Sequence, residues 1–194
     1  MSKLIDVFFI NLLWIVFSIP IITIGASTEA AFYVTIKIVD DEEGYIFKDF
    51  FKAFKQNFLQ GTILWLITVV FGYALYLLWQ IVIKKDDISF VIILISIFST
   101  VFVIAGLLYS YPLVARYENK LINHIKNSYN ICIKYFGKTI ILFIVILIEL
   151  FCIFWNKWSL LVGVLIGPEI VIYSISGISK RIFQRIDKDA KSGE

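Results

Sequence analysis

The chain has 194 residues, of which 60% are hydrophobic and only 17% are charged, and its formal net charge is +3. Soluble globular domains contain about 45–50% apolar residues, so this composition excludes an ordinary water-soluble fold. The small positive charge is spread along the chain and indicates no nucleic-acid partner. We therefore expect an integral membrane protein whose apolar surface is in contact with lipid.

Five apolar segments are long enough to cross the hydrocarbon layer of a membrane, which takes about 20 helical residues and at least about 17. In chain order they cover residues 5–24, 61–83, 88–111, 139–155 and 158–178. The sequence therefore predicts an all-α fold. We expect a single polytopic membrane domain, residues 1–194, with five transmembrane helices and amphipathic cytoplasmic surface helices.

The distribution of lysine and arginine predicts which side of the membrane each connecting segment faces. Of the 18 basic residues, 14 fall on one side of the five expected spans. The four on the other side are Lys3, Lys84, Lys85 and Lys157. Cytoplasmic loops are enriched in basic residues, so the side with 14 is expected to be cytoplasmic. This places the N-terminus outside and the C-terminus in the cytoplasm, in a multi-pass protein of the bacterial cell membrane.

Three amphipathic segments are expected on the cytoplasmic face, at residues 26–60, 113–136 and 179–187. In the first, phenylalanines recur at intervals of three and four residues, which puts five rings on one face of a helix. Burying one such ring is worth about 1.5–3 kcal/mol, so this face is expected to meet either lipid or a protein partner. The candidate docking or membrane-surface residues are Phe47, Phe50, Phe51, Phe54, Phe58, Leu121 and Ile125.

Three polar residues inside the expected spans form a candidate intramembrane site: Asn11, Glu149 and Glu169. A charged group at the centre of a bilayer costs about 2.5–3.5 kcal/mol, so such residues usually face protein or water and often have a function. Asn11 and Glu149 lie at similar depths, which allows a hydrogen bond between them. Glu169 follows Pro168, which removes a backbone donor and loosens the preceding turn. Two interpretations stay open: a proton or cation site, and a pair of protonated structural acids.

The sequence holds no signature of catalysis or of a bound cofactor. It has no glycine-rich phosphate loop, no nucleophile elbow and no metal-ligand spacing. Its one histidine is His124, and Cys132 and Cys152 fall too far apart in the expected topology to form a disulfide. The run Thr28–Ala31 is similar to the E-A-A start of the loop with which importer permeases hold their ATPase, but Thr35 stands where that loop has glycine. We expect no enzyme activity, no cofactor and no metal site.

Three runs of sequence carry a resemblance to a known family: NLLWIVFSIPIITIGASTEAAFYVTIKI, FKDFFKAFKQNF and YPLVARYENKLINHIKNS. In these runs the chain resembles the YesL-like family of bacterial integral membrane proteins, with motif positions at Asn11, Trp14, Pro20 and Gly25. The family has no established biochemical function and no agreed catalytic residue. The resemblance implies association, because family members tend to be encoded beside ABC importers for oligosaccharides in Gram-positive bacteria.

Two functions of different classes follow as expectations. The first is an accessory membrane subunit of a bacterial oligosaccharide ABC import system, which docks on the permease and stabilises it. Its partners would be membrane lipid and the permease subunits. The second is a self-sufficient transporter or channel for small molecules or ions that uses the intramembrane glutamates. The excess of amphipathic surface and the lack of catalytic motifs favour the first.

Overall fold

The computed structural model describes residues 3–42, 44–84 and 89–192, and every regular element within these ranges is helical. The elements are α1 (Lys3–Phe17), the 3-10 helix η1 (Ile21–Thr23), α2 (Ile24–Val39), α3 (Ile46–Gln56), α4 (Phe58–Lys84), α5 (Phe90–Leu108), α6 (Ser110–Arg116), α7 (Leu121–Lys134), α8 (Phe136–Phe154) and α9 (Lys157–Ser192). The predicted all-α class is confirmed. Five helical stretches of the described chain are long and apolar enough to cross a membrane: Ile21–Val39, Phe58–Lys84, Phe90–Arg116, Phe136–Phe154 and Lys157–Lys188.

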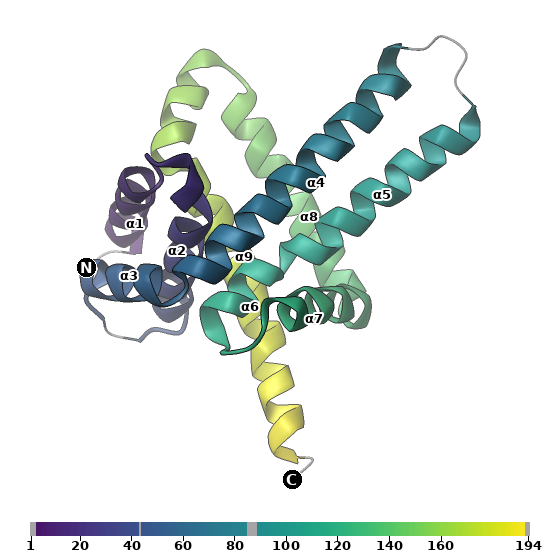
Figure 1. Cartoon of the computed structure of the whole chain (residues 1–194). Helices are drawn as coiled ribbons and strands as arrows, with labels where there is room; N and C mark the ends of the chain where they lie inside the picture. The colour runs from purple at the N-terminus through teal and green to yellow at the C-terminus, as the bar shows by residue number, and fades with distance from the viewer. Residues whose placement is uncertain (1–2, 43, 85–88, 193–194) are drawn as a thin grey trace.

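Two long hairpins diverge from a common base: α4 with α5, and α8 with the first part of α9 (Figure 1). In the first, the Trp79 indole donates to Thr100 Oγ1 at 3.0 Å, and at its base the hydroxyl of Thr68 on α4 is 3.0 Å from that of Tyr111 on α6. In the second, Asn156 Oδ1 accepts the backbone N–H groups at the start of α9, which is the usual way to cap a helix. Their outward faces carry exposed isoleucine, leucine, valine and phenylalanine, as lipid-facing helices do.

These hairpins correspond to the last four expected spans. Helix α4 contains 61–83, and α5 and the start of α6 correspond to 88–111, of which residue 88 lies outside the described residues and α5 begins at Phe90. Helix α8 matches 139–155 within a few residues, and α9 contains 158–178. Helix α7 lies within the expected surface segment 113–136. Residues 179–187 are the continuation of α9 and not a separate helix.

The first expected span, 5–24, is not a single helix. Helix α1 ends at Phe17, and Pro20 stands at the N-cap of η1, which leads into α2 at Ile24. The 15 residues of α1 extend about 22 Å, which is less than the roughly 30 Å of hydrocarbon that a span must cross. The Trp14 indole donates to Thr28 Oγ1 at 3.0 Å, so α1 folds back against α2.

The beginning of α1 lies beside the segment that leads into α3, where Figure 1 also marks the N-terminus. Asp6 and Phe9 line one groove together with residues 44–47. At the other end of α1, the ring of Phe17 is 5.0 Å from that of Phe54 on α3. Helix α1 therefore runs alongside α3. The expected span 5–24 is thus divided at Pro20 between α1 and the η1–α2 segment.

Helix α2 is the central helix of the fold, although residues 26–60 were expected to lie on the cytoplasmic surface. It packs against α1, α3, α4, α6 and α9, and ten of its 16 residues are buried. The physical reason is its content of small residues. A Cβ built at Gly25 would lie only 2.0 Å from the carbonyl oxygen of Gly61, so α2 and α4 meet backbone to backbone. Within 26–60 only α3 keeps an exposed amphipathic face.

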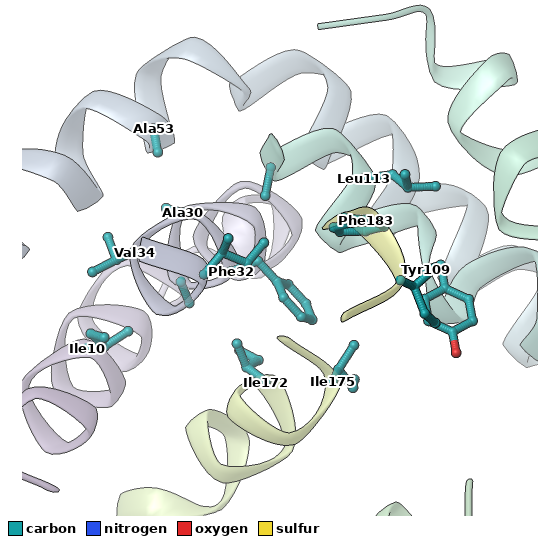
Figure 2. Close-up of a cluster of buried hydrophobic side chains, with 14 of the residues drawn as sticks. Ile10, Ala30, Phe32, Val34, Ala53, Tyr109, Leu113, Ile172, Ile175 and Phe183 are labelled. Atoms are coloured by element: carbon teal, nitrogen blue, oxygen red, sulfur yellow. The ribbon is translucent and has the colours of Figure 1, made fainter. Parts of the chain in front are cut away.

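The main apolar core lies where α2 meets its neighbours (Figure 2). Figure 2 shows the ring of Phe32 of α2 near Ile172 and Ile175 of α9, with Tyr109, which joins α5 to α6, and Leu113 of α6 on the other side. Ile10 of α1 packs at the edge of the same cluster. Because α2 and α9 share this core, polar residues on these two helices are held away from both water and lipid.

Candidate functional site

Glu169 is fully buried in α9 and is bonded to α2. The hydroxyl of Thr35 donates to Glu169 Oε1, while Oε2 has no hydrogen-bond partner among the described residues. The neighbouring Pro168 has no N–H to donate to the Val164 carbonyl, yet α9 continues without a break to Ser192. The expected loosened turn is therefore a missing hydrogen bond inside an otherwise regular helix.

Asn11 and Glu149 do not form the hydrogen bond that their depths allowed. Asn11 is fully buried and donates from Nδ2 to the carbonyl of Leu165 at 2.5 Å. Glu149 is half-buried and accepts from the Ser174 hydroxyl at 2.5 Å. Both side chains turn to α9 instead of to each other, because α9 packs against both α1 and α8. Asn11 and Glu169 therefore reach neighbouring turns of α9, and Glu149 stands apart from them.

Glu29 is a third buried acid, which the sequence analysis missed as an intramembrane residue. It lies on α2, is fully buried, and has no hydrogen-bond partner for either carboxyl oxygen in the part of the chain that the structure describes. It sits one helical turn after Gly25, on the side of α2 that meets α4. The signal was available in the sequence: Ile21–Val39 is an apolar run of 19 residues, rich in small side chains. It was missed because residues 26–60 were assigned to the cytoplasm.

We use the name α2–α9 polar core for four buried polar residues: Asn11, Thr35 and Glu169, which bond to α9 or lie on it, and Glu29, which lies on the side of α2 that meets α4. Buried hydroxyls without a partner among the described residues lie on the same helices and on α4, namely those of Ser27, Thr62, Ser176 and Ser179. A buried polar group without a partner is costly, by about 1–3 kcal/mol. Such a set of oxygens is suited to holding protons, bound water or a small cation.

An ionic cluster fastens the ends of α2 and α6 to α9. Asp40 pairs with Arg116 at 3.2 Å and with Lys180 at 3.1 Å, and Arg116 also pairs with Asp187 at 3.2 Å. The Tyr117 hydroxyl donates to Asp187 at 2.8 Å. Burial, together with the hydrogen bond to this carboxylate, raises the pKa of Tyr117 above its ordinary value, so the phenol keeps its proton. All of these charges have partners, which makes the cluster a structural clamp.

The five phenylalanines of the predicted aromatic face do not share one environment. Phe50 is fully buried and Phe54 half-buried, and both rings pack against Phe17 at 5.5 and 5.0 Å. Phe47 is 65% exposed, and Phe51 and Phe58 are also exposed. On α7, Leu121 and Ile125 are both half-buried. The aromatic face is therefore split between the core and the surface.

An open groove of about 1,010 Å³ lies beside Phe47, between α1 and the segment that leads into α3. Its walls are mainly apolar and come from α1, α2 and α3: Phe9, Leu12, Leu13, Val34, Ile38, Ile46 and Phe47. Its charged residues are Asp6 and Glu42, together with Lys37 and Asp49, which form an ion pair at 3.1 Å. We call this feature the α1–α3 groove.

His124 lines a smaller cavity of about 370 Å³ between α7, residues 117–119 and α9. The side chain is only 1% exposed, and this burial lowers the pKa of His124 below its ordinary value. Glu118 and Lys134 line the same cavity. Both cysteines are free: Cys132 is buried, which raises its pKa to about 11, and Cys152 lies on the exposed face of α8. Among the described residues no group of three or more His, Cys, Asp or Glu is placed to hold a metal ion.

The burial of His124 makes stability depend on pH. In the unfolded chain the imidazole takes up a proton near its ordinary pKa of about 6.5, whereas the folded protein resists protonation until a lower pH. The unfolded state therefore binds more protons in this window, and the stability contributed by neutral His124 is lost as the pH falls. We expect the thermal midpoint in detergent to fall from about pH 7.5 to about pH 5.5, and His124→Gln to reduce this fall. An equally steep fall in His124→Gln would show that other groups cause it.

Residues 7–79 match a protein-family model. Its description is "Protein of unknown function, DUF624". The matched range holds the motif positions Asn11, Trp14, Pro20 and Gly25, and it runs from α1 into α4. No curated protein and no solved structure matches the chain. The family description states no activity, so the resemblance to YesL-like proteins and the importer association that it implies stay predictions.

Proposed function

We propose that this chain is an accessory subunit of a bacterial oligosaccharide ABC import system, which docks on the permease and stabilises it. The observation that carries the docking part is the α1–α3 groove, which is open, apolar along its walls and charged at its edge. An amphipathic helix of a partner lays its apolar side chains into such a groove. The choice of an oligosaccharide importer rests on the family resemblance alone.

The charges of the groove favour a protein partner over lipid tails. Asp6 and Glu42 line the groove beside Phe9 and Phe47. Carboxylates are costly in contact with hydrocarbon, by about 2.5–3.5 kcal/mol at the bilayer centre. A partner helix could place its apolar side chains against the apolar walls of the groove and its basic side chains against Asp6 and Glu42. Exposed aromatic residues such as Phe47 are also the residues that most often anchor protein interfaces.

Affinity purification in mild detergent tests the docking. We expect permease subunits to be recovered at near-stoichiometric yield with the natural chain. The double substitution Tyr45→Ala with Phe47→Ala is expected to reduce the recovery at least about tenfold, since each removes an exposed anchor of the groove.

The matched control is Phe90→Ala with Phe98→Ala, which removes two exposed aromatic rings from α5, away from the groove. Its recovery of permease should equal that of the natural chain. The docking proposal fails if the chain purifies alone and sugar uptake is normal after its deletion.

We propose further that both termini face the cytoplasm. Because α1 runs alongside α3, Lys3 joins the basic side, which then holds 15 of the 18 basic residues. The other three, Lys84, Lys85 and Lys157, fall at the ends of the two long hairpins in the sequence. This bias is stronger than the one expected from five single crossings, and basic residues concentrate on the cytoplasmic side.

Reporter fusions distinguish the two topologies. Green fluorescent protein fused to either terminus should fluoresce, and alkaline phosphatase fused to either terminus should be inactive, since it needs the oxidising exterior. An active phosphatase at the N-terminus together with a fluorescent C-terminal fusion would restore the topology with the N-terminus outside.

A second candidate function is a proton- or cation-coupled transporter, and the α2–α9 polar core favours it. Glu29 and Glu169 are both fully buried, and each has at least one carboxyl oxygen without a partner among the described residues. If these acids carry a proton or cation, Glu169→Gln should abolish flux in reconstituted liposomes while leaving the fold intact, because the amide has the same shape. The matched control is Glu149→Gln on the half-buried acid held by Ser174, and it should retain flux. Absence of flux with the natural chain dismisses this candidate.

A further inference from the structure

A cluster of basic side chains surrounds Tyr135, where α7 ends and α8 begins. The ammonium nitrogens of Lys134 and Lys138 lie 5.6 and 5.5 Å from the centroid of the Tyr135 ring. Ile186 of α9 lines one cavity together with Lys134 and Tyr135, so this part of α9 lies beside the junction of α7 and α8. Arg181 and Arg185, one turn apart on α9, both act electrostatically on Lys138. Helices α7, α8 and α9 thus bring four basic side chains to one place.

Among the residues whose side chains the structure describes, no acid pairs with Lys138, Arg181 or Arg185. Asp40, Asp49 and Asp187 form ion pairs with Lys37, Arg116 and Lys180, and none of these pairs involves Lys138, Arg181 or Arg185. The nearby Asp187 is already engaged by Arg116 and Tyr117. The contrast with the fully paired ionic cluster on the same helix is clear. Like charges gathered without a counter-ion repel one another, so this place is built for an anion that comes from outside the chain.

The position of the cluster indicates what carries the anion. Lys138 lies in the first turn of α8, at the start of an apolar helix that is long enough to cross the membrane. Further along α8, Ile141 and Ile148 form an exposed apolar stripe that leads away from the cluster. An amphipathic anion matches both surfaces, because its charged head can pair with Lys138 while its hydrocarbon chain covers the apolar stripe. A soluble phosphate would leave the stripe uncovered.

We propose that Lys138, Arg181 and Arg185 bind the phosphate of an anionic phospholipid, whose acyl chains lie along the exposed face of α8. The guanidinium groups of the two arginines donate pairs of hydrogen bonds to phosphate oxygens, and the lysine adds a point charge. Tyr135 holds the lysines at the edge of this site through its ring face. The site is independent of the α1–α3 groove and of the permease proposal.

Native mass spectrometry of the purified full-length chain tests the site with two probes, dioleoylphosphatidylglycerol and dioleoylphosphatidylcholine. We expect the natural chain to retain phosphatidylglycerol in preference to phosphatidylcholine. Each basic side chain near an anionic lipid contributes roughly fivefold in affinity, so the triple variant K138Q/R181Q/R185Q should lose roughly a hundredfold for phosphatidylglycerol. The charge-conserving variant R181K/R185K should keep most of the binding.

The matched control is K48Q/K52Q/K55Q, which removes the same charge from the exposed face of α3. It should change the affinity by less than about fivefold.

Equal losses in the two triple variants would overturn the site in favour of diffuse charge attraction. Equal retention of the two lipids would overturn the requirement for an anion. Displacement of phosphatidylglycerol by excess inorganic phosphate would identify a soluble ligand instead of a lipid. If the triple variant does not fold, the single variant K138Q, compared with K52Q, makes the same distinction.

Discussion

Phe50→Ala is expected to lower the free energy of unfolding by about 3–5 kcal/mol, the usual cost of removing a ring from a closed core. The side chain is 0% exposed, and its ring lies 5.5 Å from that of Phe17 on α1. Loss of this ring opens a cavity between α1, α2 and α3, where no lipid or water can fill it without rearrangement. Unfolding in detergent, by heat or by titration with a denaturing detergent, measures the effect.

The control for Phe50 lies three residues earlier on the same helix. Phe47→Ala removes the same number of atoms from a side chain that is 65% exposed, so we expect a change of less than about 1 kcal/mol. Equal losses for the two variants would show that α3 does not pack in this orientation. It would also mean that all five phenylalanines of the aromatic face are buried to a similar extent, as their periodicity alone suggested.

Gly25→Ala is expected to destabilise the protein by about 3 kcal/mol, at the upper end of the cost of overpacking. A Cβ at this position would lie 2.0 Å from the carbonyl oxygen of Gly61 and 2.6 Å from Cβ of Trp65. One of these atoms is backbone, so relief requires α2 and α4 to separate. The same substitution at an open helical site raises stability by up to about 1 kcal/mol, and this gain is too small to compensate.

Gly72→Ala, on α4, supplies that open site, because nothing lies within 4 Å of the added methyl group. The two variants should therefore change stability in opposite directions, which the same unfolding measurement detects. If Gly25→Ala were as stable as Gly72→Ala, the close contact of α2 and α4 would not exist in the membrane. The central position of α2 would then have to be abandoned.

The long hairpins could be predicted because hydropathy is a local property. A run such as 61–83 is apolar whatever surrounds it, and its length alone makes it a membrane helix. The amphipathic period of α3 was likewise readable from the spacing of its phenylalanines. That period did not say which rings are covered. Phe50 is covered because it joins the buried core and packs against Phe17, 33 positions earlier, whereas Phe47 is 65% exposed.

The candidate site was predictable only in part, for a related reason. The presence of Glu169 in a membrane helix predicted that it would be shielded from lipid, and it is fully buried. Its partner Thr35 lies 134 positions earlier, on a helix that was expected on the surface. The expected bond between Asn11 and Glu149 failed because depth along a span does not specify which face of a helix meets which neighbour. Glu29 was missed through the same misplacement of α2.

By itself the sequence determined that this protein is helical and too apolar for an ordinary water-soluble fold. These properties follow from composition and periodicity, which need no knowledge of neighbours. The tertiary structure alone decided that the chain turns back at Pro20 and that α2 lies at the centre with Glu29 enclosed. It also brought together Lys138 of α8 and Arg181 and Arg185 of α9, which have no ion-pair partner among the side chains that the structure describes. The physical reason is that close packing depends on small residues meeting across the fold, as Gly25 and Gly61 do, and such meetings leave no periodic trace in the sequence.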